Sequence, residues 1–145
     1  MVFLLMIPTI IMALSDFRSR EIALWSLLLL FALCLPISIY LYGGGAVVNH
    51  IMLNIFLLAY LGAGILLYLW IRHRRFTNPL KRHLGSGDLL FVLALTPLFD
   101  PEEFLIFLLA SMVGALAWWM VSGRKSSIPL VGILGIAFGI YLIII

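Results

Sequence analysis

The chain has 145 residues, of which 65% are hydrophobic and only 10% are charged, with a formal net charge of +3 and a mean hydropathy of +1.24. Soluble domains carry about 25% charged and roughly 45–50% apolar residues, so this composition excludes a soluble globule and predicts an integral membrane protein. The length allows one domain, which we place at residues 1–145.

Apolar runs separated by polar residues divide the chain into six segments. A helix that crosses the bilayer needs about 20 residues, so the second, third, fifth and sixth runs are long enough, whereas the first and fourth are short. In chain order, the six segments are residues 1–15, 22–42, 47–71, 86–99, 103–121 and 127–145.

The basic residues fall in alternate loops of this six-segment arrangement, and the other side carries none. Basic loops of membrane proteins face the cytoplasm, so both termini are expected on the non-cytoplasmic side of the inner (plasma) membrane. We therefore predict an all-α bundle of six transmembrane helices. The first, third and fifth loops hold Arg18 and Arg20; Arg72, Arg74, Arg75, Lys81 and Arg82; and Arg124 and Lys125, whereas Asp100, Glu102 and Glu103 lie on the opposite side.

On the cytoplasmic side the acidic residues are Asp16, Glu21 and Asp88. Asp16 closes the first segment and Asp88 opens the fourth, within Gly85-Ser86-Gly87-Asp88, so both are expected at a similar depth. Ionisable residues at the ends of apolar segments are costly, and they usually have a functional or paired role.

Two facing carboxylates can hydrolyse a peptide bond. Because like charges a few ångströms apart cannot both ionise, the pair shares one proton. The ionised member takes a proton from water while the protonated member polarises the scissile carbonyl, and the pair titrates as a unit. Two structural alternatives stay open: Asp16 could pair with Arg18 or Arg20, and Asp88 could cap its own helix.

Three stretches of the chain resemble the type IV prepilin peptidase and preflagellin peptidase family. Residues 16–22, with Asp16, Arg18 and Ile22, are similar to that family's Asp-x-Arg-x-x-x-Ile stretch, and residues 85–88 match its GxGD motif. The Arg124-Lys125 pair followed by Ile128-Pro129 resembles the entry to its last helix.

The resemblance implies an intramembrane aspartyl endopeptidase with Asp16 and Asp88 as the catalytic pair, supported by Arg18, Ile22, Gly85, Gly87 and Pro129. Such enzymes remove a short basic leader from membrane-anchored, prepilin-like precursors at the cytoplasmic face. The chain departs from the family pattern at Ile22-Ala23-Leu24, where Ile-Pro-Asn is usual, and at Leu90, where a lysine is common. It departs again at residues 128–132, Ile-Pro-Leu-Val-Gly, where the family's final motif is usually richer in Pro and Gly. Its single cysteine, Cys34, cannot form the tetracysteine region of the bifunctional members, so we expect no methyltransferase activity.

We expect no cofactor and no metal, because His50, His73 and His83 lack the spacing of ligands and His50 lies on the opposite side from the other two. The basic stretch at residues 72–83 suits anionic lipid headgroups better than nucleic acid. Gly135 and Gly139 form a GxxxG pair, for which we favour packing within the bundle over homodimerisation; the oligomeric state stays open.

Two other functions remain as alternatives to the peptidase. The first is an inactive family member that acts as a membrane scaffold or assembly subunit. The second, less favoured, is a component of a proton or cation transporter, which would be expected to carry acids at mid-membrane or an internal repeat.

Overall fold

The structure, a computed structural model, describes residues 2–19, 24–73, 86–122 and 129–144, and within them every regular element is a helix. The prediction of an all-α chain is confirmed for this part of the chain. Six α-helices follow a short 3₁₀ helix, η1: η1 (Val2–Leu5), α1 (Met6–Ser19), α2 (Leu24–Tyr42), α3 (Gly44–His73), α5 (Ser86–Leu95), α6 (Pro101–Val121) and α7 (Leu130–Ile144).

Several helix boundaries differ from the predicted segments, most clearly at the ends of α1 and α5 and at the junction of α2 and α3. Helix α1 continues to Ser19, so Asp16 lies inside its last turns rather than after its end. Helix α5 ends at Leu95, and residues 96–99 form a turn. Gly43 alone separates α2 from α3, with a φ of 81° that favours glycine.

Three of the described helices are long and apolar enough to cross a membrane. These spans are Leu24–Tyr42, Gly44–Tyr68 and Pro101–Val121. Helices α1 and α5 are short, as expected, with 14 and 10 residues, and the described part of α7 has 15, roughly 22 Å at 1.5 Å per residue. The protein is thus a membrane protein by these criteria, while six crossings and the side of the termini stay predictions.

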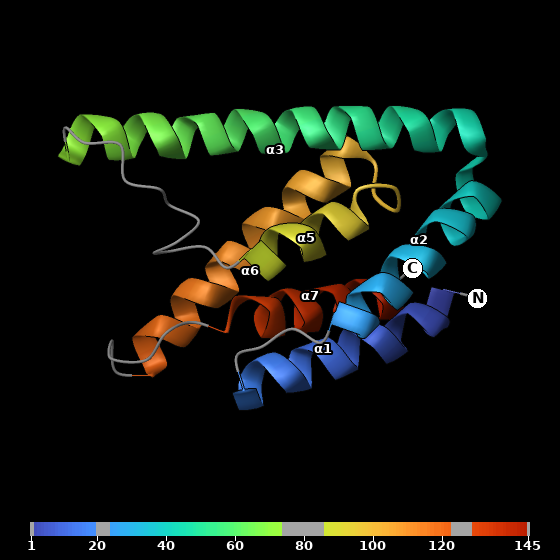
Figure 1. Cartoon of the computed structure of the whole chain (residues 1–145), viewed down its shortest axis with the longest axis horizontal. Helices are drawn as coiled ribbons and strands as arrows, with labels where there is room; N and C mark the ends of the chain where they lie inside the picture. The colour runs from blue at the N-terminus through green and yellow to red at the C-terminus, as the bar shows by residue number, and fades with distance from the viewer. Residues whose placement is uncertain (1, 20–23, 74–85, 123–128, 145) are drawn as a thin grey trace.

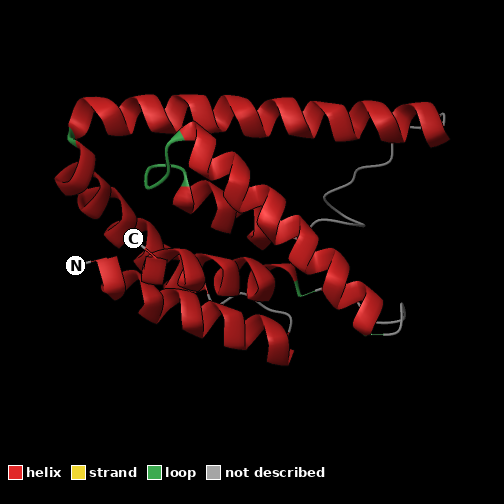
Figure 2. Ribbon diagram, turned by 180° about the vertical axis from the view of Figure 1, so that it is seen from behind, coloured by secondary structure: helices red, strands yellow, loops and turns green. Residues whose placement is uncertain are grey.

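The helices run back and forth, so that the ends expected at the cytoplasm gather at one end of the bundle. Figures 1 and 2 show the last turns of α1, α3 and α6 at this end, together with the first turns of α5 and α7. Helix α7 packs against α1 and also contacts α5 and α6. The alternation is the one expected from the distribution of basic loops.

Aromatic side chains fill the core where the turn after α5 meets α6 and α7. Phe99 lies at the centre, fully buried, with its ring centroid 5.0 Å from that of Phe107 and 4.3 Å from that of Tyr141. By contrast, α3 exposes most of its apolar side chains. In a bilayer such side chains can meet lipid tails without cost, because the tails are as apolar as they are.

Hydrogen bonds fix the opposite end of the bundle. The buried Asn54 of α3 donates through Nδ2 to the carbonyl oxygens of Thr96 and Phe99, at 2.9 and 2.8 Å. The Tyr141 hydroxyl of α7 donates to Glu103 Oε2 of α6 at 2.6 Å. These contacts hold the turn after α5 against α3, and α7 against α6.

Candidate active site

Asp16 is buried and binds the first turn of another helix. Its side chain is 7% exposed, and its Oδ2 accepts a hydrogen bond of 2.8 Å from the main-chain N–H of Gly132 in α7. The first N–H groups of an α-helix have no partner within the helix, and a carboxylate is favoured there. Asp16 of α1 therefore caps α7 as an N-cap side chain would, but from a different helix.

The close approach of α1 to α7 depends on Gly132. A Cβ atom at this position would lie 2.5, 2.8 and 2.9 Å from Cε2, Cδ2 and Cζ of Phe17, so no larger residue fits while the Phe17 ring stays in place. That ring also packs edge-on against Trp118 of α6, at a centroid distance of 5.5 Å. Further along α7, a Cβ atom at Gly135 would lie 3.2 Å from Cβ of Ala13.

Asp88 lies in the first turn of α5, and both Asp88 and the preceding Gly87 are half-buried. Its helix is held by packing: Phe91, Ala94 and Leu95 are completely buried, and α5 contacts α2 and α7. Both aspartates thus lie on helices that touch α7, at the same end of the bundle (Figure 1). The direct approach of the two carboxylates stays a prediction.

Of the five supporting residues expected from the sequence, Arg18, Gly87 and Pro129 lie within the described part of the chain. Pro129 is buried directly before α7, and its carbonyl accepts the N–H of Ile133 at 3.1 Å, the first hydrogen bond of that helix. Arg18 is exposed in the last turn of α1. Ile22 and Gly85 lie outside the described residues. Pro129 is therefore close in sequence to the N–H that Asp16 binds, whereas Arg18 points to the surface.

A model of the type IV leader peptidase family matches residues 3–120, most of the chain. The chain belongs to the type IV leader peptidase family. The match includes Asp16 and Asp88 and ends before Pro129, so the likeness at the last helix rests on the residues quoted above. No curated protein and no solved structure matches the chain.

Two residues of the candidate site in this leader peptidase family member were not anticipated from the sequence: Gly132 and Phe17. Both lie next to residues that the resemblance singled out, since Phe17 follows Asp16 and Gly132 lies three residues after Pro129. Nothing in either stretch indicates that the two residues touch. Among the described residues, no group of three or more His, Cys, Asp or Glu side chains could hold a metal ion.

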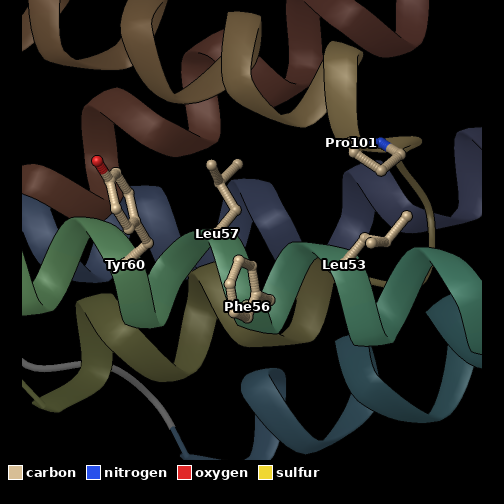
Figure 3. A pocket seen from close by; sticks show the side chains of 5 residues that line it. All are labelled: Leu53, Phe56, Leu57, Tyr60 and Pro101. Atoms are coloured by element: carbon tan, nitrogen blue, oxygen red, sulfur yellow. The ribbon is translucent and has the colours of Figure 1, made fainter.

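An apolar groove lies on the family member's surface away from Asp16, between α3 and the start of α6. It is lined by Leu53, Phe56, Leu57, Tyr60 and Pro101, with a volume of about 330 Å³. Figure 3 shows Leu53, Leu57 and Tyr60 along one side of α3, with Pro101 near them. Its lining offers no carboxylate, imidazole or amine, so we assign it no part in the chemistry.

Proposed function

We propose that this member of the type IV leader peptidase family is an intramembrane aspartyl endopeptidase with Asp16 and Asp88 as its catalytic pair. Its substrate would be a membrane-anchored, prepilin-like precursor, cut between a short basic leader and the apolar helix that follows, at the cytoplasmic face of the inner membrane. The single observation that carries the proposal is the buried Asp16 carboxylate, held against α7 at the end of the bundle where Asp88 opens α5.

The chemistry needs only the two carboxyl groups and water. One proton is shared by the pair, because two carboxylates a few ångströms apart cannot both ionise. The ionised carboxylate removes a proton from water as its oxygen attacks the scissile carbonyl carbon, and the protonated carboxyl donates its proton to the carbonyl oxygen. When the C–N bond breaks, the carboxyl that took the proton from water passes it to the leaving nitrogen. A hydroxyl of the tetrahedral intermediate returns its proton to the other carboxylate as the carbonyl re-forms. The reaction consumes one water and returns the pair to its starting state.

Burial of Asp16 supports this chemistry in a second way. Hydrogen bonds and charges act more strongly where water is excluded, and a carboxylate fixed by a main-chain N–H needs no reorganisation when the substrate arrives. Asp16 has both features, at 7% exposure and a 2.8 Å bond to Gly132.

The site also fits the geometry of the proposed substrate. The last turns of α1 and the first turn of α5 lie at one end of the bundle (Figure 1). A precursor whose apolar helix stands in the bilayer alongside these helices would carry its scissile bond to the same depth. The basic loops expected at this side would attract anionic lipid headgroups, at about 1 kcal/mol per basic residue near the surface.

One observation favours a second candidate, an inactive scaffold of the same fold. A carboxylate that caps a helix has a structural role of its own, and Asp16 caps α7. In such a protein the aspartates would be kept for stability, and no substrate would be cut.

Co-expression with a reporter that carries a prepilin leader tests the proposal. We compare the wild type with Asp16→Asn and Asp88→Asn, and with Glu102→Gln as a control, since Glu102 is an exposed acid at the opposite end of α6. We expect cleavage by the wild type and the control, and none by the two aspartate variants. Cleavage that survives both substitutions would refute the catalytic pair. A wild type that cuts no candidate precursor would favour the scaffold, and proton or cation flux without cleavage would favour a transporter.

A further inference from the structure

We infer that Gly132 is a positioning residue for the proposed reaction: it holds the Asp16 carboxylate through its main-chain N–H, and its lack of a side chain leaves room for the Phe17 ring beside that bond. The inference rests on the proposed function and adds a part of the site to it. The family match at residues 3–120 does not reach Gly132.

A hydrogen bond joins Gly132 of α7 to Asp16 of α1. Gly132 N–H donates to Asp16 Oδ2 at 2.8 Å, between residues 116 positions apart in the chain. Gly132 is the third residue of α7, where N–H groups point out of the helix end without an internal acceptor. A donor on a helix end is fixed by the main chain and has no rotamers, so it sets the position of the carboxylate more narrowly than a side chain would.

The absence of a side chain at Gly132 leaves room for the ring of Phe17. Three ring atoms of Phe17 lie 2.5 to 2.9 Å from the place where a Cβ atom of residue 132 would stand. An alanine and the Phe17 ring therefore cannot both keep their positions. Either the ring leaves its contact with Trp118, or the start of α7 moves away from α1. Movement of α7 would lengthen the bond between the Gly132 N–H and Asp16 Oδ2, whereas movement of the ring would remove the packing of Phe17 against Trp118 from the end of α1 that carries Asp16.

The substitution Gly132→Ala should accordingly reduce the rate of cleavage more than it reduces binding of the precursor. Displacements of about 1 Å in a catalytic group cost up to roughly 100-fold in rate, and we expect kcat to fall at least about tenfold with KM within a factor of about two. A merely structural role would instead lower the amount of folded protein, which is measured separately by thermal unfolding in detergent.

A second substitution should repair the first. In Phe17→Ala/Gly132→Ala the ring is absent, so the alanine at position 132 has room and the N–H can reach Asp16 again. We expect the double variant to be clearly more active than Gly132→Ala, and close to Phe17→Ala, which keeps the main-chain hydrogen bond. The matched control is Gly139→Ala in the same helix, because a Cβ atom there meets nothing within 4 Å.

A spectroscopic measurement tests the contact without cleavage. The chain has 12 glycines, so protein labelled with ¹⁵N-glycine gives few amide signals in detergent, and Gly132 is identified by the signal lost in Gly132→Ala. Asp16→Asn should move the Gly132 signal more than that of Gly139, which is identified in the same way.

The outcomes separate this inference from the proposed function. If the wild type cleaves the reporter but Gly132→Ala cleaves as fast, or the double variant is no better than Gly132→Ala, the inference is overturned and the proposed function stands. A Gly132 amide signal that does not shift in the Asp16→Asn variant also overturns the inference. If the wild type cleaves no precursor, the proposed function fails, and the positioning role fails with it.

Discussion

Asp16 Oδ2 and the N–H of Gly132 are joined by a 2.8 Å hydrogen bond that ties the end of α1 to the start of α7. Asp16 therefore has a structural role in addition to its proposed catalytic one, and a mutation can separate the two. As a helix cap it contributes to stability, and as a buried carboxylate at the end of the bundle it is available for proton transfer. The stability of Asp16 variants and their activity should therefore respond differently to the same substitution.

Asp16→Ala and Asp16→Asn should both abolish cleavage, but only the alanine should clearly destabilise the protein. Alanine leaves the Gly132 N–H without its acceptor, and a buried donor left unsatisfied costs about 1–3 kcal/mol. Asparagine keeps an oxygen at that place, so it retains a weaker form of the bond. Thermal unfolding in detergent and cleavage of the leader reporter measure the two effects on the same preparations.

The control for this pair is Leu14→Ala, since Leu14 lies on the same helix with 64% of its side chain exposed. It should leave both the melting temperature and cleavage nearly unchanged. An Asp16→Ala protein as stable as the wild type would show that the cap contributes nothing. An Asp16→Asn protein that still cleaves would show that Asp16 is structural.

The sequence was informative about the bundle because the physics of a bilayer is simple. Spanning segments must be long and apolar, so the runs in the sequence located six helices, and the clustering of basic residues in alternate loops indicated how they alternate. The boundaries were less accurate where polar residues lie within helices. Asp16 and Arg18 looked like the end of a segment, yet α1 continues past them to Ser19.

One boundary error had a visible cause in the sequence. The fourth segment was expected to continue to Phe99, but α5 ends at Leu95 and the chain turns at residues 96–99. Pro97 disfavours the helical conformation of the residue before it, and Thr96 instead donates its hydroxyl to the carbonyl of Leu93 at 2.8 Å. Hydropathy does not indicate the end of the helix at Leu95, because Leu98 and Phe99 are as apolar as the residues of α5.

Only part of the candidate site could be predicted from the sequence. The motifs indicated Asp16 and Asp88, since each stands in a short local pattern. Gly132 could not be found in this way, because its importance comes from a tertiary contact with Phe17 and Asp16. One glycine of α7 resembles another in the sequence, and only the structure shows that Gly132 meets a ring while Gly139 meets open space.

Asn54 should control the position of α5, and through it the position of Asp88. Its Nδ2 donates hydrogen bonds to the carbonyl oxygens of Thr96 and Phe99. Both residues are buried and lie after the end of α5, so their carbonyls have no partner in that helix. Asn54→Ala should therefore lower the free energy of unfolding by about 1–3 kcal/mol, and it should reduce cleavage at a temperature where the protein is still folded.

Asn49→Ala is the matched control, because Asn49 is an exposed asparagine on the same helix. Unfolding in detergent and reporter cleavage are measured for both variants. Equal stability of the two variants would contradict the role given to the amide of Asn54. A destabilised Asn54→Ala protein with unchanged cleavage would show that the C-terminal end of α5 does not control the position of its first turn, where Asp88 lies.

The two glycines of the GxxxG pair should respond in opposite directions. A Cβ atom at Gly135 would lie 3.2 Å from Cβ of Ala13 and 3.4 Å from Cγ2 of Thr9, whereas one at Gly139 meets nothing within 4 Å. Gly135→Ala must push α1 and α7 apart by a few tenths of an ångström, and we expect a loss of about 1 kcal/mol, at the low end for an overpacked contact. Gly139→Ala should be neutral or slightly stabilising, because alanine favours a helix over glycine.

The same pair of variants decides between packing within the bundle and homodimerisation. Packing of Gly135 against α1 supports the first, and it predicts that neither substitution changes the molar mass measured by light scattering in detergent. If Gly139→Ala alone converts a dimer to a monomer, the open side of α7 at Gly139 is an interface between copies. In that case the lack of neighbours at Gly139 would reflect a second chain that packs there.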